Sequence, residues 1–225
     1  MMMKKLIPAF VLILFLSSCE DDCIRSTDDS GNQYLDLYTL AGEKNYYNGY
    51  EPMNADSTIN AVIEIPAGTN QKWEVDKESG YIIWEIKNGS HRVVNYISYP
   101  ANYGMIPKTL LPKELSGDGD PIDVIVLGPA IDRGEVVKIK ILGMLVLLDG
   151  GEKDDKLIGI EESSLFSGIS DLDELDNAYP GVTSIISTWF SNYKANGEME
   201  FLGFGSKEEA IDQLLEAINA FAIYN

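Results

Sequence analysis

The sequence is poor in the residues that mark several common protein classes. Its 225 residues hold 17 Lys and Arg against 36 Asp and Glu, a formal net charge of −19, and this shortage of positive charge excludes a basic nucleic-acid-binding protein. No apolar run approaches the roughly 20 residues of a membrane-spanning helix, since Ile141–Leu148 contains Gly143. Two cysteines are too few for a small fold that depends on several disulfide bonds. The 45% of apolar residues is ordinary for a globular protein.

The first residues have the layout of an export signal. Two lysines precede the apolar stretch Leu6–Leu16, and small residues follow it. The segment Leu16–Cys19 resembles the lipobox of bacterial lipoproteins, which implies removal of residues 1–18 and lipid attachment at Cys19. The alternative is a plain signal peptide that leaves Cys19 and Cys23 free or joined to each other. We expect an exported protein, anchored by lipid to a bacterial membrane on its periplasmic face or at the cell surface.

The rest of the chain divides into a tether and one domain. Residues 19–33 are polar and acidic almost throughout, which predicts a flexible tether. Residues 34–60 are rich in Tyr, Asn and Gly and have no clear period, so we expect an N-terminal arm and assign no secondary structure to it. We expect residues 34–225 to form a single domain.

Short strands are predicted in the middle of the chain and helices after them. Apolar residues recur at helical spacing over residues 180–194, and Ser206 with Glu209 forms a capping box before a second helix. This pattern favours a mainly β domain, a small barrel with helices packed on it. The strand-like runs are Ala61–Ile65, Lys72–Val75, Tyr81–Ile86, Asp123–Leu127, Glu135–Leu142, Met144–Leu148 and Leu157–Ile160.

Three carboxylates fall within the six residues Asp118–Asp123, just before an apolar strand. Such charges repel one another unless the side chains splay into water or enclose a hard cation. An EF-hand calcium loop counted from Asp118 is excluded, because its positions 5, 6 and 12 hold Ile122, Asp123 and Pro129. Both a metal site and a solvated acidic turn stay open on spacing alone.

The Asp-x-Asp-Pro-x-Asp pattern of Asp118–Asp123 resembles the signature of the family I soluble inorganic pyrophosphatases. The resemblance extends over residues 61–204, with its landmarks in the order of the family. It implies a small, strongly twisted, closed β-barrel of OB-like form with flanking C-terminal helices. The other landmarks are Val62–Pro66, Lys72–Gly80, Tyr99–Gly104, Asp149–Lys156 and the pair Tyr193-Lys194.

The resemblance also implies roles for individual residues. Asp120 is implied as the general base beside the attacking water. Lys87 is an alternative to Arg92, Asp155 is an alternative to Asp154, and His91 is expected at the surface without a role. The implied metal ligands are Asp118, Asp120, Asp123, Asp149, Asp154 and Glu64. The implied substrate ligands are Lys72, Arg92, Tyr103, Lys156, Tyr193 and Lys194, with Glu74 and Tyr99 supporting them.

These roles predict an Mg²⁺-dependent enzyme that hydrolyses inorganic diphosphate to two phosphates. Several Mg²⁺ ions per site would activate water for direct in-line attack, without a covalent intermediate. An acidic protein should repel a tetra-anion, so cations must reverse the local field. The alternatives are a hydrolase of polyphosphate or nucleotides and a non-catalytic lipoprotein that binds metal or phosphate. We expect no nucleic-acid partner, membrane contact through the lipid anchor only, and leave a homo-oligomer open.

Overall fold

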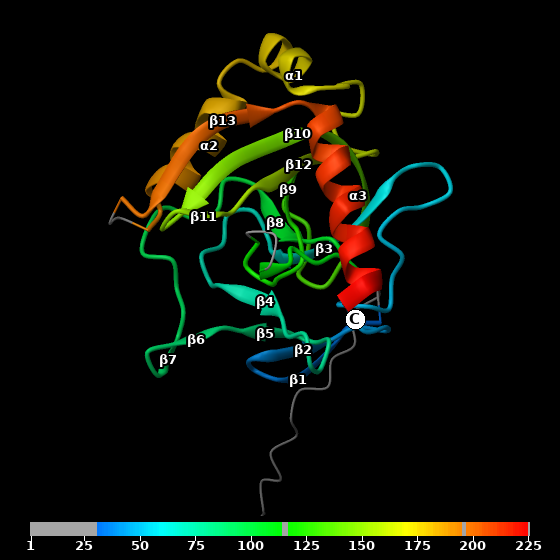
Figure 1. The fold of residues 1–225 in the computed structure, drawn as a ribbon. Coiled ribbons are helices and arrows are strands. Elements are labelled where there is room, and N and C mark those ends of the chain that lie inside the picture. Colours follow the sequence, from blue (N-terminus) through cyan, green and yellow to red (C-terminus); the bar gives the residue numbers. More distant parts are fainter. Residues whose placement is uncertain (1–30, 114–116, 195–196, 225) are drawn as a thin grey trace, which may run out of the picture.

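The computed structural model describes residues 31–113, 117–194 and 197–224 (Figure 1). The predicted signal segment, residues 1–18, and Cys19 lie outside the described residues, as does most of the predicted tether. The predicted mainly β fold with a few helices is confirmed. The strands are β1 Gln33–Asp36, β2 Thr39–Ala41, β3 Ile59–Ile65, β4 Trp73–Val75, β5 Ile82–Trp84, β6 Ile86–Lys87, β7 Ser90–His91, β8 Asn102–Met105, β9 Asp123–Leu127, β10 Val136–Asp149, β11 Glu152–Lys153, β12 Lys156–Glu161 and β13 Met199–Gly205. The helices are α1 Leu172–Ala178, α2 Val182–Asn192 and α3 Lys207–Tyr224.

The larger sheet is built around the long strand β10. Its strand order is β11-β10-β12-β9-β8-β3, and β13 also pairs with β10. The start of β10 pairs with β3 and its middle pairs with β12, both antiparallel. Strands β12 and β9 are parallel. Their Val, Ile and Leu side chains are buried, as expected for strands that are covered on both faces.

Strand β10 corrects one boundary of the sequence prediction. The runs Glu135–Leu142 and Met144–Leu148 were expected as two strands separated at Gly143, but they form one strand. The pairing register of β10 with β12 shifts between Ile141 and Gly143. A Cβ atom at Gly143 would lie 2.7 Å from the carbonyl oxygen of Gly205. The glycine therefore allows β13 to approach closely and does not end the strand.

The N-terminal arm contributes to a smaller sheet with the order β1-β2-β5-β4. This sheet lies below the larger one in Figure 1. Leu40 and Tyr46 of the arm are buried against Trp73 and Ile82, and the Tyr46 hydroxyl donates a hydrogen bond of 2.8 Å to Asn32. The arm is thus part of the packed domain, which its composition did not reveal.

Two of the three described helices match the predicted ones. Helix α2 lies within the predicted range 180–194 and buries Ile186, Trp189 and Phe190. The capping box of α3 is present, because Ser206 and Glu209 each bond the other's backbone N–H. Helix α1 and strand β13 were not predicted. In the described part of the chain, no helix combines the length and the apolar character needed to span a membrane.

Candidate active site

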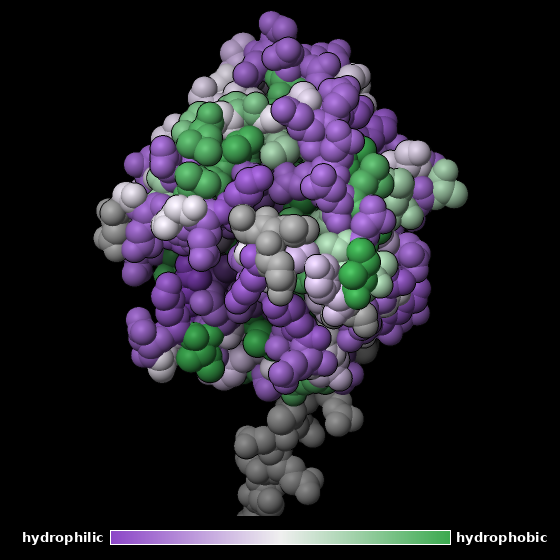
Figure 2. Space-filling model, in the orientation of Figure 1, coloured by the Kyte–Doolittle hydropathy of each residue, from purple (hydrophilic) through white to green (hydrophobic). Residues whose placement is uncertain are grey.

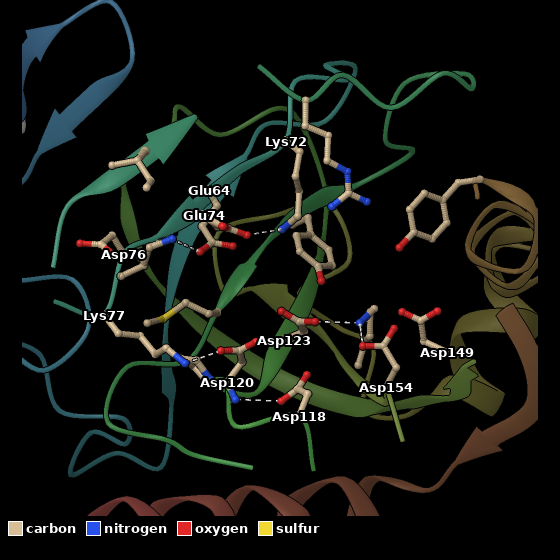
Figure 3. Close-up of a pocket in the computed structure, with 18 of the residues that line it drawn as sticks. Glu64, Lys72, Glu74, Asp76, Lys77, Asp118, Asp120, Asp123, Asp149 and Asp154 are labelled. Carbon is tan, nitrogen blue, oxygen red and sulfur yellow. Dashed lines mark hydrogen bonds and ion pairs between the residues drawn. The ribbon is translucent and has the colours of Figure 1, made fainter. Parts of the chain in front are cut away.

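A cavity of about 330 Å³ lies between the two sheets (Figure 3). The face in Figure 2 is hollowed left of its centre, and the surface around the hollow is hydrophilic. Almost every residue that the resemblance singled out in the described chain lines the cavity, and Tyr99 is the exception. These lining residues are Glu64, Lys72, Glu74, Arg92, Tyr103, Asp118, Asp120, Asp123, Asp149, Asp154, Lys156, Tyr193 and Lys194.

At the centre of the cavity, Lys156 pairs with carboxylates from both acidic loops. Its Nζ atom lies 2.7 Å from Asp123 and 3.0 Å from Asp154. The Lys156 side chain is only 3% exposed. Burial alone would lower the pKa of this lysine, but the two carboxylates raise it. Lys156 therefore stays charged and holds the two loops together.

The first acidic loop forms a tight turn before β9. The Asp120 backbone N–H donates a hydrogen bond of 2.8 Å to the Asp118 carboxylate, and Gly119 between them has φ +86°, a conformation that favours glycine. Burial and the neighbouring carboxylates raise the pKa of Asp118 to about 6. The Asp120 carboxylate accepts a 2.6 Å hydrogen bond from Lys77, a residue that received no predicted role.

The second acidic loop presents Asp149 and Asp154 to the same cavity. Asp149 forms an ion pair with Lys194, which follows α2. The alternative ligand Asp155 is buried elsewhere and accepts the Leu147 N–H at 3.1 Å. Asp154, and not Asp155, lines the cavity.

The cavity wall carries Glu64 from β3 and Lys72 and Glu74 from the chain at β4. Lys72 lies 3.7 Å from Glu74. Glu64 is 4% exposed, and its Oε1 atom accepts the Val75 N–H at 2.7 Å. Burial raises the pKa of Glu64 to about 8, although the nearby Lys72 ammonium opposes this shift. Figure 3 shows the three side chains pointing toward one another.

Aromatic side chains complete the wall. The Tyr103 ring lies between two lysines, with Lys72 Nζ at 5.4 Å and Lys156 Nζ at 5.7 Å from its centroid. Burial raises the pKa of the Tyr103 hydroxyl, which therefore remains a hydrogen-bond donor. Tyr193 stacks on Trp189 with centroids 4.8 Å apart. Tyr99 supports this group by packing 5.4 Å from Tyr103.

Three residues whose roles the sequence left uncertain lie in or beside the hairpin of β6 and β7. They are Lys87, His91 and Arg92. Arg92 lines the cavity, whereas Lys87 is exposed in β6 and does not. The Arg92 guanidinium bonds Glu85 at 2.7 Å, a partner that sequence reasoning missed. His91, which was expected at the surface, is half-buried, and its ring stacks on Tyr38 with centroids 3.9 Å apart.

The donor set of the cavity fits a hard cation. Its candidate ligands are all carboxylates, which suit Mg²⁺ better than a soft metal. Within the described ranges, no group of three His, Cys, Asp or Glu side chains stands in a position to hold one metal ion. Lysines instead form ion pairs with Asp120, Asp123, Asp149 and Asp154. To bind a metal ion, these carboxylates would have to give up their ion pairs with the lysines.

Comparisons with known proteins agree with the geometry. Residues 61–222 match the family model described as inorganic pyrophosphatase. The inorganic pyrophosphatase of Campylobacter jejuni is 33% identical over 167 residues, which cover 72% of this chain and 91% of that protein. The mitochondrial inorganic pyrophosphatase of Saccharomyces cerevisiae is 35% identical over 173 residues, or 68% of this chain and 56% of that longer protein.

A solved structure shows the same fold. The inorganic pyrophosphatase of Schistosoma japonicum superimposes with a TM-score of 0.75 at 29% identity, covering 78% of this chain and 70% of that one. The chain spans about half the length of some eukaryotic relatives, with 56% of the yeast protein and 44% of one from Caenorhabditis elegans. Because the family model matches most of the chain in the segment that builds the cavity, the chain belongs to the inorganic pyrophosphatase family.

Proposed function

We propose that this protein hydrolyses inorganic diphosphate to two phosphates with the help of Mg²⁺. The observation that carries the proposal is the convergence of two acidic loops with five basic side chains on one cavity. The acidic groups suit divalent cations and the basic groups suit phosphate oxygens. Neither set alone would hold both a tetra-anion and the cations that neutralise it.

The proposed metal ligands are the carboxylates of both acidic loops together with Glu64. Glu64 would use Oε2, because Oε1 already accepts the Val75 N–H. The chemistry that bound Mg²⁺ supplies in such a site is neutralisation of phosphate charge and a lower pKa of water. The loop ligands are Asp118, Asp120, Asp123, Asp149 and Asp154.

The side chains of the protein would divide the remaining work between proton transfer and substrate binding. Asp120 would accept the proton of the attacking water, since its carboxylate lies at the cavity mouth and is 57% exposed. Tyr103 and Tyr193 would donate their hydroxyls to phosphate. Direct attack needs no nucleophilic side chain, and phosphoryl transfer then depends on positioning and charge stabilisation. The cationic substrate ligands would be Lys72, Arg92, Lys156 and Lys194.

The test is phosphate release from diphosphate, tripolyphosphate and ATP by the purified protein, with and without Mg²⁺. We expect rapid release from diphosphate that requires Mg²⁺ and is abolished by a chelator. Faster release from ATP or tripolyphosphate would replace the proposal with a broader phosphoanhydride hydrolase. Metal binding without any release would indicate a binding protein.

We also infer a closed barrel within a single domain over residues 34–225. The support is the circular order of pairings, in which β10 pairs with β12, β12 with β9, β9 with β8, β8 with β3 and β3 with β10. The smaller sheet and the three helices would flank this barrel. Limited proteolysis should leave residues 34–225 as one resistant fragment, and early cleavage inside it would contradict a single domain.

We further propose that the protein is exported and anchored by lipid at Cys19. The support is the sequence Leu16–Cys19 after a short apolar stretch. A Cys19→Ser variant should move from the membrane fraction to the soluble fraction. Protease treatment of intact cells should digest a surface protein and spare a periplasmic one. The mass of the detergent-solubilised protein would determine whether it is a homo-oligomer.

A further inference from the structure

Lys77 connects the two sheets across the mouth of the cavity. It follows β4 of the smaller sheet, and its Nζ atom donates to the Asp120 carboxylate at 2.6 Å and to the Gly119 carbonyl at 2.9 Å (Figure 3). Both acceptors belong to the acidic loop that precedes β9 of the larger sheet. Lys77 therefore fastens the loop that carries the proposed general base to the opposite wall of the cavity.

Lys77 differs from Lys156, which pairs with both acidic loops, in its exposure to solvent. Lys156 is 3% exposed and is held by two carboxylates, so its removal would leave two partly buried charges without this partner. The Lys77 side chain is 45% exposed and its partner Asp120 is 57% exposed. Exposed ion pairs are weak because water competes for both charges. Lys77 can therefore leave its carboxylate at little cost.

An ammonium group and a divalent cation compete for the same carboxylate. An Mg²⁺ ion bound to the Asp120 carboxylate would lie close to the Lys77 ammonium group, and the two positive charges would repel each other. A bound Mg²⁺ would therefore displace Lys77 or bind less tightly in its presence. The loop would then lose its fastening to the smaller sheet.

We propose that Lys77 is a positioning residue that holds Asp120 and its loop against the smaller sheet and competes with Mg²⁺ for this carboxylate. The proposal rests on the proposed function, because that function makes Asp120 a metal ligand and the general base. The competition itself is between two cations, Mg²⁺ and the Lys77 ammonium group. Lys77 would therefore change the affinity of the protein for Mg²⁺ before the reaction begins. Lys77 acts through Asp120 and needs no contact with the substrate.

The experiment is calorimetric titration of Mg²⁺ into the full chain in detergent, without substrate. Lys77→Met should bind Mg²⁺ about three- to fivefold more tightly than the unaltered protein, which is the range expected for loss of one exposed ion pair. Lys77→Arg retains the cation and should resemble the unaltered protein. The difference should shrink in about 1 M KCl, where the Debye length is about 3 Å.

A matched control separates this competition from a general change in charge. Lys138 forms an exposed ion pair with Asp56 at 3.6 Å, and neither residue lines the cavity. Lys138→Met removes the same charge and should leave Mg²⁺ affinity unchanged. Equal or weaker affinity in Lys77→Met than in Lys138→Met would overturn the proposal, as would the absence of Mg²⁺ binding. Tighter binding in a protein that releases no phosphate would retain the proposal and reject only the hydrolytic function.

Discussion

Lys156 and Asp123 are register partners in the parallel strands β12 and β9, and their side chains form an ion pair of 2.7 Å. Each of these strands begins directly after an acidic loop. Parallel pairing places the starts of both strands at the same edge of the sheet. The register of β12 on β9 therefore brings the two acidic loops together, and Lys156 compensates the charge that this approach creates.

Removal of the Lys156 cation should destabilise the fold. Lys156→Met would leave Asp123 and Asp154 without their shared partner, so we expect a loss of about 3 kcal/mol in the free energy of unfolding. Urea denaturation in a metal-free buffer measures it. Lys140→Met, which breaks an exposed pair with Glu162 at 3.6 Å, should change stability by less than about 0.5 kcal/mol. Equal effects of the two variants would contradict the assigned role of Lys156.

Gly104, the glycine of the Tyr99–Gly104 segment, should not tolerate a larger residue, for a steric reason. A Cβ atom at this position would lie 1.8 Å from the Val62 carbonyl oxygen in the neighbouring strand. We expect Gly104→Ala to cost about 3 kcal/mol or more, because backbone must move. At Gly168 a Cβ atom would meet nothing within 4 Å, so Gly168→Ala serves as the control. Thermal denaturation compares them, and similar melting temperatures would refute the argument.

Glu85 should control the position of Arg92. The Glu85 carboxylate holds the guanidinium at 2.7 Å, and its backbone oxygen accepts the Arg92 N–H at 2.8 Å. Glu85→Ala should raise KM for diphosphate about tenfold with a smaller change in kcat, because a misplaced cation binds substrate less well. Glu85→Gln keeps an acceptor and should retain part of the affinity.

A double-variant cycle tests whether Glu85 acts through Arg92. If it does, Glu85→Ala combined with Arg92→Ala should be no worse than Arg92→Ala alone. Fully additive losses in kcat/KM would show that Glu85 acts independently of Arg92.

The sequence allowed most of the cavity residues to be predicted, but not their geometry. The acidic loops and the Tyr193-Lys194 pair were recognised from motifs, and all of them line the cavity. Their convergence depends on the pairing of β12 with β9, which involves residues far apart in the chain. Strand β13 was missed for a similar reason, since its Gly203 and Gly205 weaken a strand signal and pairing with β10 provides its order.

Glu85 and Lys77, the two partners that the sequence analysis missed, differ in how strongly the sequence indicates their contacts. Glu85 and Arg92 are joined by the hairpin of β6 and β7, and the dipeptide Asn88-Gly89 at its tip is a strong hairpin signal that would have paired them. Lys77 had no such signal. Alternation along β4 would turn it away from Lys72 and Glu74, but the chain turns after Val75 and brings Lys77 to the cavity.

The most direct test of the account is the rate of diphosphate hydrolysis by Asp120→Asn. This variant keeps the shape of the side chain and removes the proposed proton acceptor, so the rate with Mg²⁺ should fall on the order of 10²–10⁴-fold. Asp212→Asn, at an exposed position on α3, loses the same charge and should keep the full rate. An Asp120→Asn variant as fast as this control would contradict the central role of the cavity in catalysis.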